Sequence, residues 1–133
     1  MMTSTFEFLA HPELGYVHIV VHGKMTAPDA ASARGRMHTE YPRLNRLWDF
    51  RHADLTAWTA DDMRMFNETI MMNEGATTKV RIAGLVARDV DFGVARLYES
   101  ITKDSFPIEG AVFRDEAQAV AFVTNIAPAG PAD

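Results

Sequence analysis

The amino-acid sequence predicts an α/β protein with a mixed sheet of about five strands and about four helices, in the order ββαβαβαβα. Three observations support this fold class. Two β-prone runs precede the first helix signal, strand and helix patterns then alternate along the chain, and the later strands are largely apolar on both faces. This alternation implies right-handed crossovers and a mostly parallel sheet, to which the first two strands add an antiparallel edge.

The first two strands are predicted to form a hairpin over residues 5–10 and 16–22. The segment between them contains Pro12 and Gly15, which mark a turn. The second strand alternates in polarity, and one of its faces is expected to be dry because it carries Val17, Ile19 and Val21.

A first helix is predicted after Gly23, which we expect to end the second strand. Thr26 can cap this helix, Pro28 suits its first turn, and Asp29 places a negative charge near its N-terminus. The helix is expected to continue to Pro42.

The remaining elements follow as alternating strands and helices. Residues 43–51 form a strand that is apolar around Trp48 except at Asp49, and a capped helix begins at Thr59. Residues 79–88 read as a buried parallel strand. A third helix has its apolar stripe at Val94, Leu97, Tyr98 and Ile101, and a last strand over 108–113 leads into a fourth helix with Ala117, Val120 and Ala121.

Composition narrows the class of protein further. The 133 residues suit one domain, which we place at 1–126, followed by a disordered tail at 127–133 that is rich in Pro and Ala. A net charge of −5 and scattered basic residues argue against nucleic acid as a partner. The chain has no cysteine, and no export signal or membrane span is visible in it, so we expect a cytoplasmic protein.

The element order, together with particular residues, resembles the SpoIIAA-like family, small bacterial proteins related in fold to STAS domains. The resemblance covers residues 6–123. It rests on four segments: Gly23-Lys24-Met25-Thr26, Leu47-Trp48-Asp49-Phe50-Arg51, Asp91-Phe92-Gly93-Val94-Ala95-Arg96-Leu97-Tyr98-Glu99 and Val112-Phe113-Arg114-Asp115-Glu116-Ala117.

The resemblance implies a non-enzymatic module. It suggests either protein docking, as in STAS domains, or carriage of small lipophilic molecules, as in CRAL-TRIO domains. In STAS antagonists that a kinase switches, a Ser or Thr stands at the start of the second helix within an Asp-Ser-Ser-Gly-like motif. In this chain Thr59 is the hydroxyl residue at the corresponding position. The surrounding segment lacks the Ser-Gly pair of the motif, which argues against such a switch.

We therefore expect a binding site at the crevice between the second and third helices, near the carboxyl ends of the strands. Methionine is deformable and suits adaptable apolar sites, and four methionines lie in the second helix. The expected ligand-binding residues are Trp58, Met63, Phe66, Phe92 and Tyr98. Thr59, Met65 and Met71 are candidates for contact with a protein partner or for a homodimer interface; peripheral membrane contact is left open.

The alternative from a different class is a small enzyme that uses Asp49 or a histidine in the same crevice. Asp49 stands in an apolar strand, where it would act as an acid or base with a raised pKa, or would merely cap loop amides. Arg51 lies on the same face and is its expected partner. His18 and His22 are too far apart on one strand to chelate a metal ion together, and no pattern indicates a metal or another cofactor.

Overall fold

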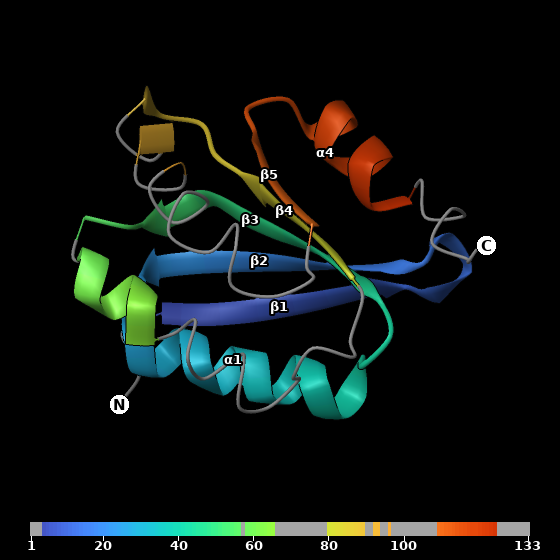
Figure 1. Cartoon of the computed structure of the whole chain (residues 1–133), viewed down its shortest axis with the longest axis horizontal. Coiled ribbons are helices and arrows are strands. Elements are labelled where there is room, and N and C mark those ends of the chain that lie inside the picture. Colours follow the sequence, from blue (N-terminus) through green and yellow to red (C-terminus); the bar gives the residue numbers. More distant parts are fainter. Residues whose placement is uncertain are drawn as a thin grey trace.

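Of the chain's 133 residues, the computed structural model describes 4–56, 58–65, 80–89, 92–93, 96 and 109–124. The elements, in chain order, are β1 (Ser4–His11), the 3-10 helix η1 (Pro12–Leu14), β2 (Tyr16–Lys24), α1 (Ala27–Glu40), β3 (Asn45–Asp54), β4 (Arg81–Leu85), β5 (Glu109–Phe113) and α4 (Glu116–Thr124) (Figure 1). Residues 60–65, 89, 92–93 and 96 are also helical, where the sequence predicts the second and third helices.

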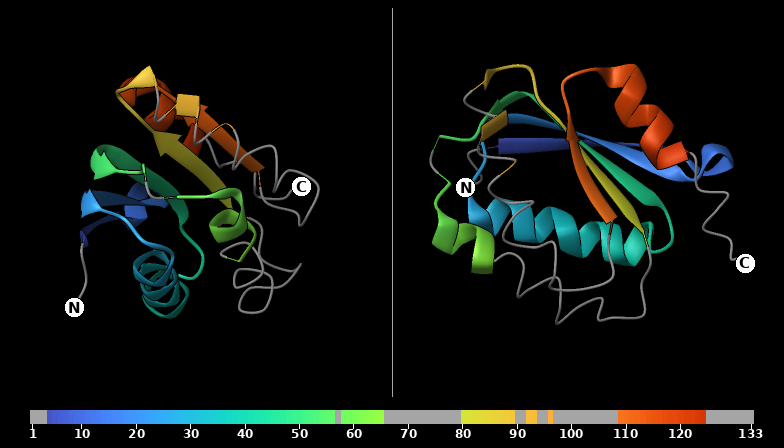
Figure 2. Two further views of the ribbon diagram at one scale, coloured as in Figure 1. Left: turned by 90° about the vertical axis from the view of Figure 1, so that its left-hand side faces the viewer. Right: turned by 45° about the horizontal axis from the view of Figure 1, so that its top comes forward.

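The five strands form one sheet in the order β1-β2-β3-β4-β5. The pair β1–β2 is antiparallel, whereas the pairs β2–β3, β3–β4 and β4–β5 are parallel. This confirms the predicted mixed sheet with an antiparallel edge. Helices α1 and α4 lie on opposite faces of it (Figure 2). Alternate side chains of each strand point to opposite faces, so each helix packs on its own set of strand residues.

Helix α1 forms where its capping signals stand. The Thr26 hydroxyl accepts a hydrogen bond from the backbone N–H of Asp29 at 3.3 Å, and proline occupies the first turn. The helix ends at Glu40, where the next residue, Tyr41, still donates its N–H to the Met37 carbonyl. The predicted start and end of this helix are confirmed.

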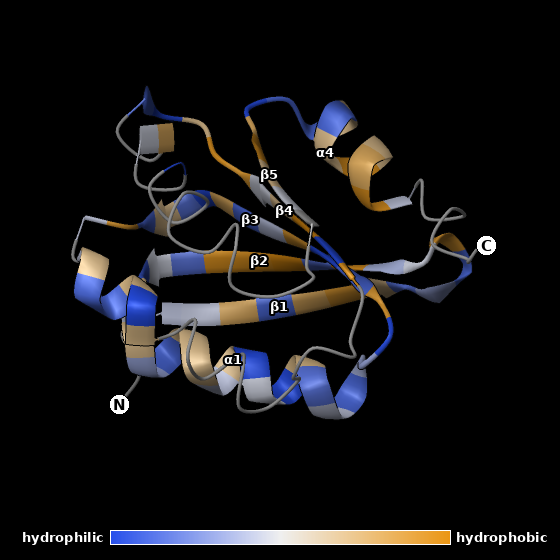
Figure 3. Cartoon of the chain, in the orientation of Figure 1, coloured by the Kyte–Doolittle hydropathy of each residue, from blue (hydrophilic) through white to orange (hydrophobic). Residues whose placement is uncertain are grey.

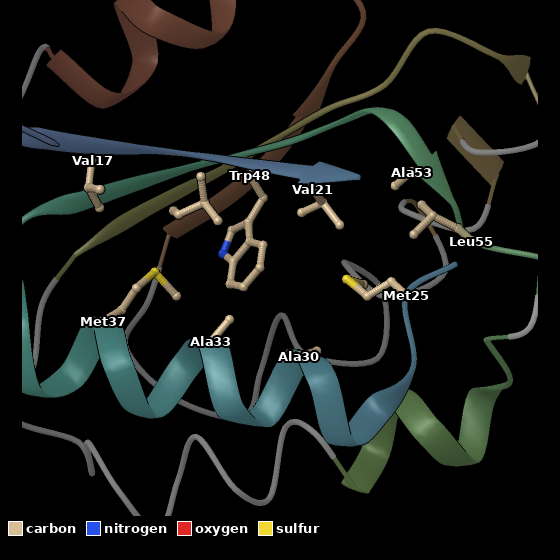
Figure 4. Close-up of a cluster of buried hydrophobic side chains, with 10 residues drawn as sticks. Val17, Val21, Met25, Ala30, Ala33, Met37, Trp48, Ala53 and Leu55 are labelled. Atoms are coloured by element: carbon tan, nitrogen blue, oxygen red, sulfur yellow. The ribbon is translucent and has the colours of Figure 1, made fainter. Parts of the chain in front are cut away.

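The larger core lies between α1 and the sheet. Figure 3 shows apolar residues along β2 and β4 and hydrophilic residues over much of α1. In Figure 4, the inward side chains of α1 point toward Trp48 and the valines of β2. The buried members of this cluster are Val17, Ile19, Val21, Met25, Ala30, Ala33, Met37, Trp48, Ala53 and Leu55. Burial of each larger side chain contributes on the order of 1.5–3 kcal/mol.

A second, smaller core lies under α4. It contains Tyr16, Leu47, Ala83, Leu85, Ala119 and Val123. Asn45 fastens this side of the molecule because its Nδ2 donates to the Val123 carbonyl at 2.8 Å and its Oδ1 accepts from the Arg81 N–H at 2.7 Å. The start of β3 is thus tied to both β4 and the end of α4.

Two arginines are buried, which the sequence pattern does not predict. Arg46 in β3 is wholly buried, and Arg34 in α1 is 3% exposed. Burial, together with the nearby charge of Arg34, lowers the pKa of Arg46 to about 9. Arg46 therefore remains cationic at neutral pH.

Strand lengths differ from the prediction in three places. β2 does not stop at Gly23 but continues to Lys24, because glycine tolerates the φ of 89° found there. β3 starts at Asn45 and continues three residues beyond Arg51, to Asp54. β4 is confined to Arg81–Leu85, half the predicted length.

Other expectations fall outside the described residues. The tail at 127–133 is among them, and the domain extent of 1–126 stays a prediction. No helix within the described part of the chain is long and apolar enough to cross a membrane.

Candidate functional site

An open pocket of about 460 Å³ lies at the carboxyl ends of β2 and β3, beside the segment that follows β4. We call it the carboxyl-edge pocket. Its lining residues are Gly23, Arg51, His52, Ala53, Asp54, Thr56 and Arg88. The carboxyl edge of a mostly parallel sheet is where ligands of open α/β folds bind. The pocket therefore lies at that edge of the sheet, but none of the predicted ligand-binding residues that the structure describes lines it, and most of its lining residues are polar or charged.

The pocket exists because neighbouring strands end at different heights. β4 pairs with β3 only from Arg46 to Asp49, whereas β2 pairs with β3 as far as Asp54. The last residues of β3 thus extend past the end of β4 and leave a step in the sheet. Arg51 and His52 lie on this overhanging segment.

Asp49 stands at the base of the step and carries a dense set of polar contacts. It is 1% exposed. Its Oδ1 accepts from the N–H and the Nε of Arg51 at 3.1 and 2.9 Å, and its Oδ2 accepts from the Arg51 Nη2 at 2.7 Å. The Nε2 of His18 lies 3.0 Å from the same Oδ2. The predicted pairing of Asp49 with Arg51 is confirmed.

These contacts determine the ionisation of Asp49. Burial opposes its charge, but the hydrogen bonds from His18 and Arg51 prevail and hold the pKa of Asp49 well below its usual range. The hydrogen bond to Asp49, together with the nearby charges of Asp49 and Glu116, raises the pKa of Arg51. The predicted alternative in which Asp49 acts as an acid or base with a raised pKa is therefore wrong, because the pKa is lowered. The carboxylate is thus ionised at neutral pH, and it also accepts one backbone N–H, which is close to the capping role considered from the sequence.

Arg51 is held in one orientation by this arrangement. Its Nη2 also contacts the Oε1 of Glu116, the first residue of α4, at 3.0 Å, and its side chain is 33% exposed. In the described part of the chain its Nη1 has no hydrogen-bond partner, and neither ring nitrogen of His52 has one. The pocket wall therefore offers two hydrogen-bond donors to a ligand, the Nη1 of Arg51 and the ring of His52.

His52 belongs to a pair of stacked imidazoles. Its ring lies 5.5 Å from that of His22, with an interplanar angle of 12°, because the two residues are register partners on β2 and β3. The Nε2 of His22 lies 2.9 Å from the Oε1 of Glu7 on β1. Among the described residues, no group of three or more His, Asp or Glu side chains could hold a metal ion.

Asp54 adds a negative charge to the pocket. Its Oδ1 accepts from both the N–H and the hydroxyl of Thr56, at 2.9 and 2.6 Å, and these bonds lower its pKa. The nearby charges of Lys24 and Arg88 lower it further. The pocket lining thus combines two arginines, Arg51 and Arg88, with one carboxylate that Thr56 holds in place.

The residues predicted to bind a ligand do not converge in one described pocket. Trp58 packs against the α1 core and donates its Nε1–H to the Met25 carbonyl at 2.9 Å, and Met63 is 1% exposed. Phe92 lies under the guanidinium groups of Arg96 and Arg114, at 5.9 and 5.8 Å. Phe66 and Tyr98 lie outside the described residues, so the crevice between the second and third helices stays a prediction.

The residues predicted to contact a partner are placed in part. Thr59 and Asp62 cap the second helix reciprocally, since each side chain accepts the backbone N–H of the other at 3.1 Å. Met65 is 61% exposed, and Met71 lies outside the described residues. The signal missed in the sequence is His52. Its parity alone would place it on the Trp48 face of β3, and only the register shift between β2 and β3 brings it beside His22.

Comparison with known proteins identifies the fold. No family model and no curated protein matches the sequence. The structure is similar to the crystal structure of an uncharacterized protein of the DUF3478 family, with a SpoIIAA-like fold, from Shewanella loihica PV-4. The TM-score is 0.59 at 16% identity, over 92% of this chain and 95% of the other. The chain thus has a SpoIIAA-like fold, as its sequence predicts.

Proposed function

We propose that the protein is a binding module whose carboxyl-edge pocket takes a small molecule bearing a carboxylate or a phosphate. The observation that carries the proposal is the fixed guanidinium of Arg51, which buried Asp49 orients and whose Nη1 is not consumed by the described residues. Asp49 and Glu116 occupy Nε and Nη2, so the two N–H groups of Nη1 are those that can donate to an oxygen of an anionic ligand. His52 supplies a second donor on the same wall.

The pocket's chemistry favours binding over catalysis. Its closest pairing of a hydroxyl with a carboxylate, Thr56 with Asp54, closes a local turn. The lowered pKa of Asp54 makes this carboxylate a weak base, so it is poorly suited to activate the hydroxyl. The lining holds no other hydroxyl and no thiol among the residues described.

Acid–base catalysis by His18 is the second candidate, because an imidazole oriented by a buried carboxylate is an arrangement that general bases use. His18 does not line the pocket, and its side chain is only 13% exposed. Binding is therefore the function that these contacts support better. Docking of a partner protein, or of a lipophilic molecule at Phe66, Met71 and Tyr98, remains a prediction for the undescribed crevice.

The test is an NMR titration of the whole protein with inorganic phosphate, decanoate and decanol. We expect phosphate or decanoate to shift the Arg51 and His52 signals saturably, while decanol, which has the same chain without the charge, leaves them in place. Arg51→Lys keeps the positive charge but loses the Nη1 donor and its fixed orientation, and it should weaken anion binding by about tenfold.

Two histidine variants give a matched control. His52→Ala should weaken anion binding, whereas His38→Ala, which alters an exposed histidine of α1, should not. Equal binding of decanol and decanoate, or equal effects of the two histidine variants, would contradict the proposal. Saturable binding of decanol alone would favour the lipophilic crevice instead.

A further inference from the structure

The outer strand of the sheet leaves one backbone edge open. The N–H and the hydroxyl of Ser4 both donate to the Oδ2 of Asp29, at 3.2 and 2.8 Å, so the backbone of Ser4 faces away from β2. Backbone groups alternate in direction along a strand, which turns those of Phe6, Phe8 and Ala10 outward as well. Within the described residues, these three form no hydrogen bond on that side.

This edge lacks most of the features with which proteins block strand pairing, and the charged residue that it does carry is Glu7. β1 is eight residues long, pairs with β2 in an unbroken register, and contains no proline, lysine or glycine. In Figure 1 it forms the border of the sheet beside α1. The strand at the opposite border, β5, has only five residues.

Apolar side chains on both faces of β1 are incompletely covered. On the α1 face, Phe8 is half-buried; its ring stacks on Tyr41 at 6.0 Å and lies 4.4 Å below the guanidinium carbon of Arg36. On the other face, Leu9 is 46% exposed. A strand added at this edge would cover both.

We propose that β1 pairs with β1 of a second copy of the chain, antiparallel and about a two-fold axis at Leu9. The two five-stranded sheets then join into one continuous sheet. Phe8 and the partner's Ala10 exchange backbone hydrogen bonds in this register, because both face outward. Leu9 meets its own symmetry mate at the close spacing of a non-hydrogen-bonded pair.

Charge and polarity favour this register over those with the axis at Glu7 or Phe8. With the axis at Leu9, exposed Glu7 stands opposite the partner's His11, which has an N–H donor in either protonation state. An axis at Glu7 would place two carboxylates opposite each other, and an axis at Phe8 would place Leu9 against Glu7. The pairing does not depend on the carboxyl-edge pocket.

The experiment is sedimentation velocity of the full chain from about ten micromolar to about one millimolar, the range suited to a small interface. We expect a concentration-dependent dimer. Leu9→Lys places two like charges opposite each other on the axis. The loss of this one cross-strand pair should raise the dissociation constant of the dimer at least tenfold. Leu14→Lys is the matched control, because Leu14 is 47% exposed but lies in η1, outside the pairing.

A second pair of variants tests the backbone. Ala10→Pro removes an outward N–H that β2 does not use, whereas Ala10→Val keeps it, so only the proline variant should dissociate the dimer. Hydrogen exchange in the peptide containing Phe8 and Ala10 should slow as concentration rises. Circular dichroism shows whether each variant is folded. If Ala10→Pro is unfolded, the comparison of Leu9→Lys with Leu14→Lys tests the proposal by itself.

Several results would overturn the proposal. These are a monomer at every concentration, a dimer that Leu9→Lys and Leu14→Lys affect equally, and a dimer that Met65→Gln weakens while Leu9→Lys does not. The last result would assign the interface to the second helix.

Discussion

Replacement of Asp49 by Asn tests whether the buried carboxylate holds the sheet edge together. The variant keeps the shape of the side chain but removes the charge that Arg51 and His18 face at 2.7 to 3.0 Å. Removing one partner of a buried ion pair costs about 3–5 kcal/mol. Arg51 is one-third exposed and retains Glu116, so we expect the lower end of that range, about 3 kcal/mol.

The effect should depend on pH in a defined direction. The folded-state pKa of Asp49 is depressed below its unfolded value, which is about 3.9. The stabilisation is thus fully present above the unfolded pKa and is lost as the pH falls through the folded pKa. The difference in unfolding free energy between the parent and Asp49→Asn should be constant from about pH 5 to 7 and should shrink below about pH 4.

Urea unfolding followed by circular dichroism across this pH range measures both effects. Asp61→Asn is the control, because its carboxylate lies 2.8 Å from Arg64 on an exposed helix surface and should leave the midpoint nearly unchanged. A loss below about 1 kcal/mol at pH 7, or a difference that does not change with pH, would refute the account of Asp49 as a buried anion that stabilises the edge.

Two further predictions concern the core and the second helix. Leu85 is fully buried on β4 between two neighbouring strands, so Leu85→Ala should cost about 2–5 kcal/mol in urea unfolding; a loss below about 1 kcal/mol would contradict its central place. Thr59→Ala should cost roughly 1 kcal/mol through loss of the helix cap, while Thr59→Asp should be nearly neutral because Asp also caps. An altered partner interaction in Thr59→Asp at unchanged stability would instead indicate a phosphoswitch.

The parts of the fold that sequence predicts are those set by neighbouring residues. Thr26 and Asp29 lie three positions apart, so the helix start that they form is local, and the structure confirms it. The dry face of β2 follows from alternation alone, and Val17, Ile19 and Val21 are fully buried.

The sequence predicts at which edge of the sheet a site would lie, but it does not predict which residues form the pocket. Asp49 and Arg51 are two residues apart on one strand, so their contact follows from parity. The contact of Asp49 with His18 depends on how β2 and β3 align across 31 positions of sequence. The difference in length between β3 and β4, which creates the pocket, is a property of the assembled sheet and leaves no local pattern.

The direction of Trp58 shows the same limit. An aromatic residue before a helix can anchor a ligand or fold back onto the core, and composition does not separate these outcomes. The Nε1–H of Trp58 donates to the Met25 carbonyl, 33 positions away, and the ring packs against the α1 core.

The overhang of β3 separates the residues that make the fold from those that give the pocket its chemistry. The residues from Arg46 to Asp49 pair with strands on both sides, whereas His52 and Asp54 pair only with β2. Substitutions at His52 or Thr56 therefore disturb few structural contacts. These positions can thus be varied as a small library on an otherwise fixed scaffold.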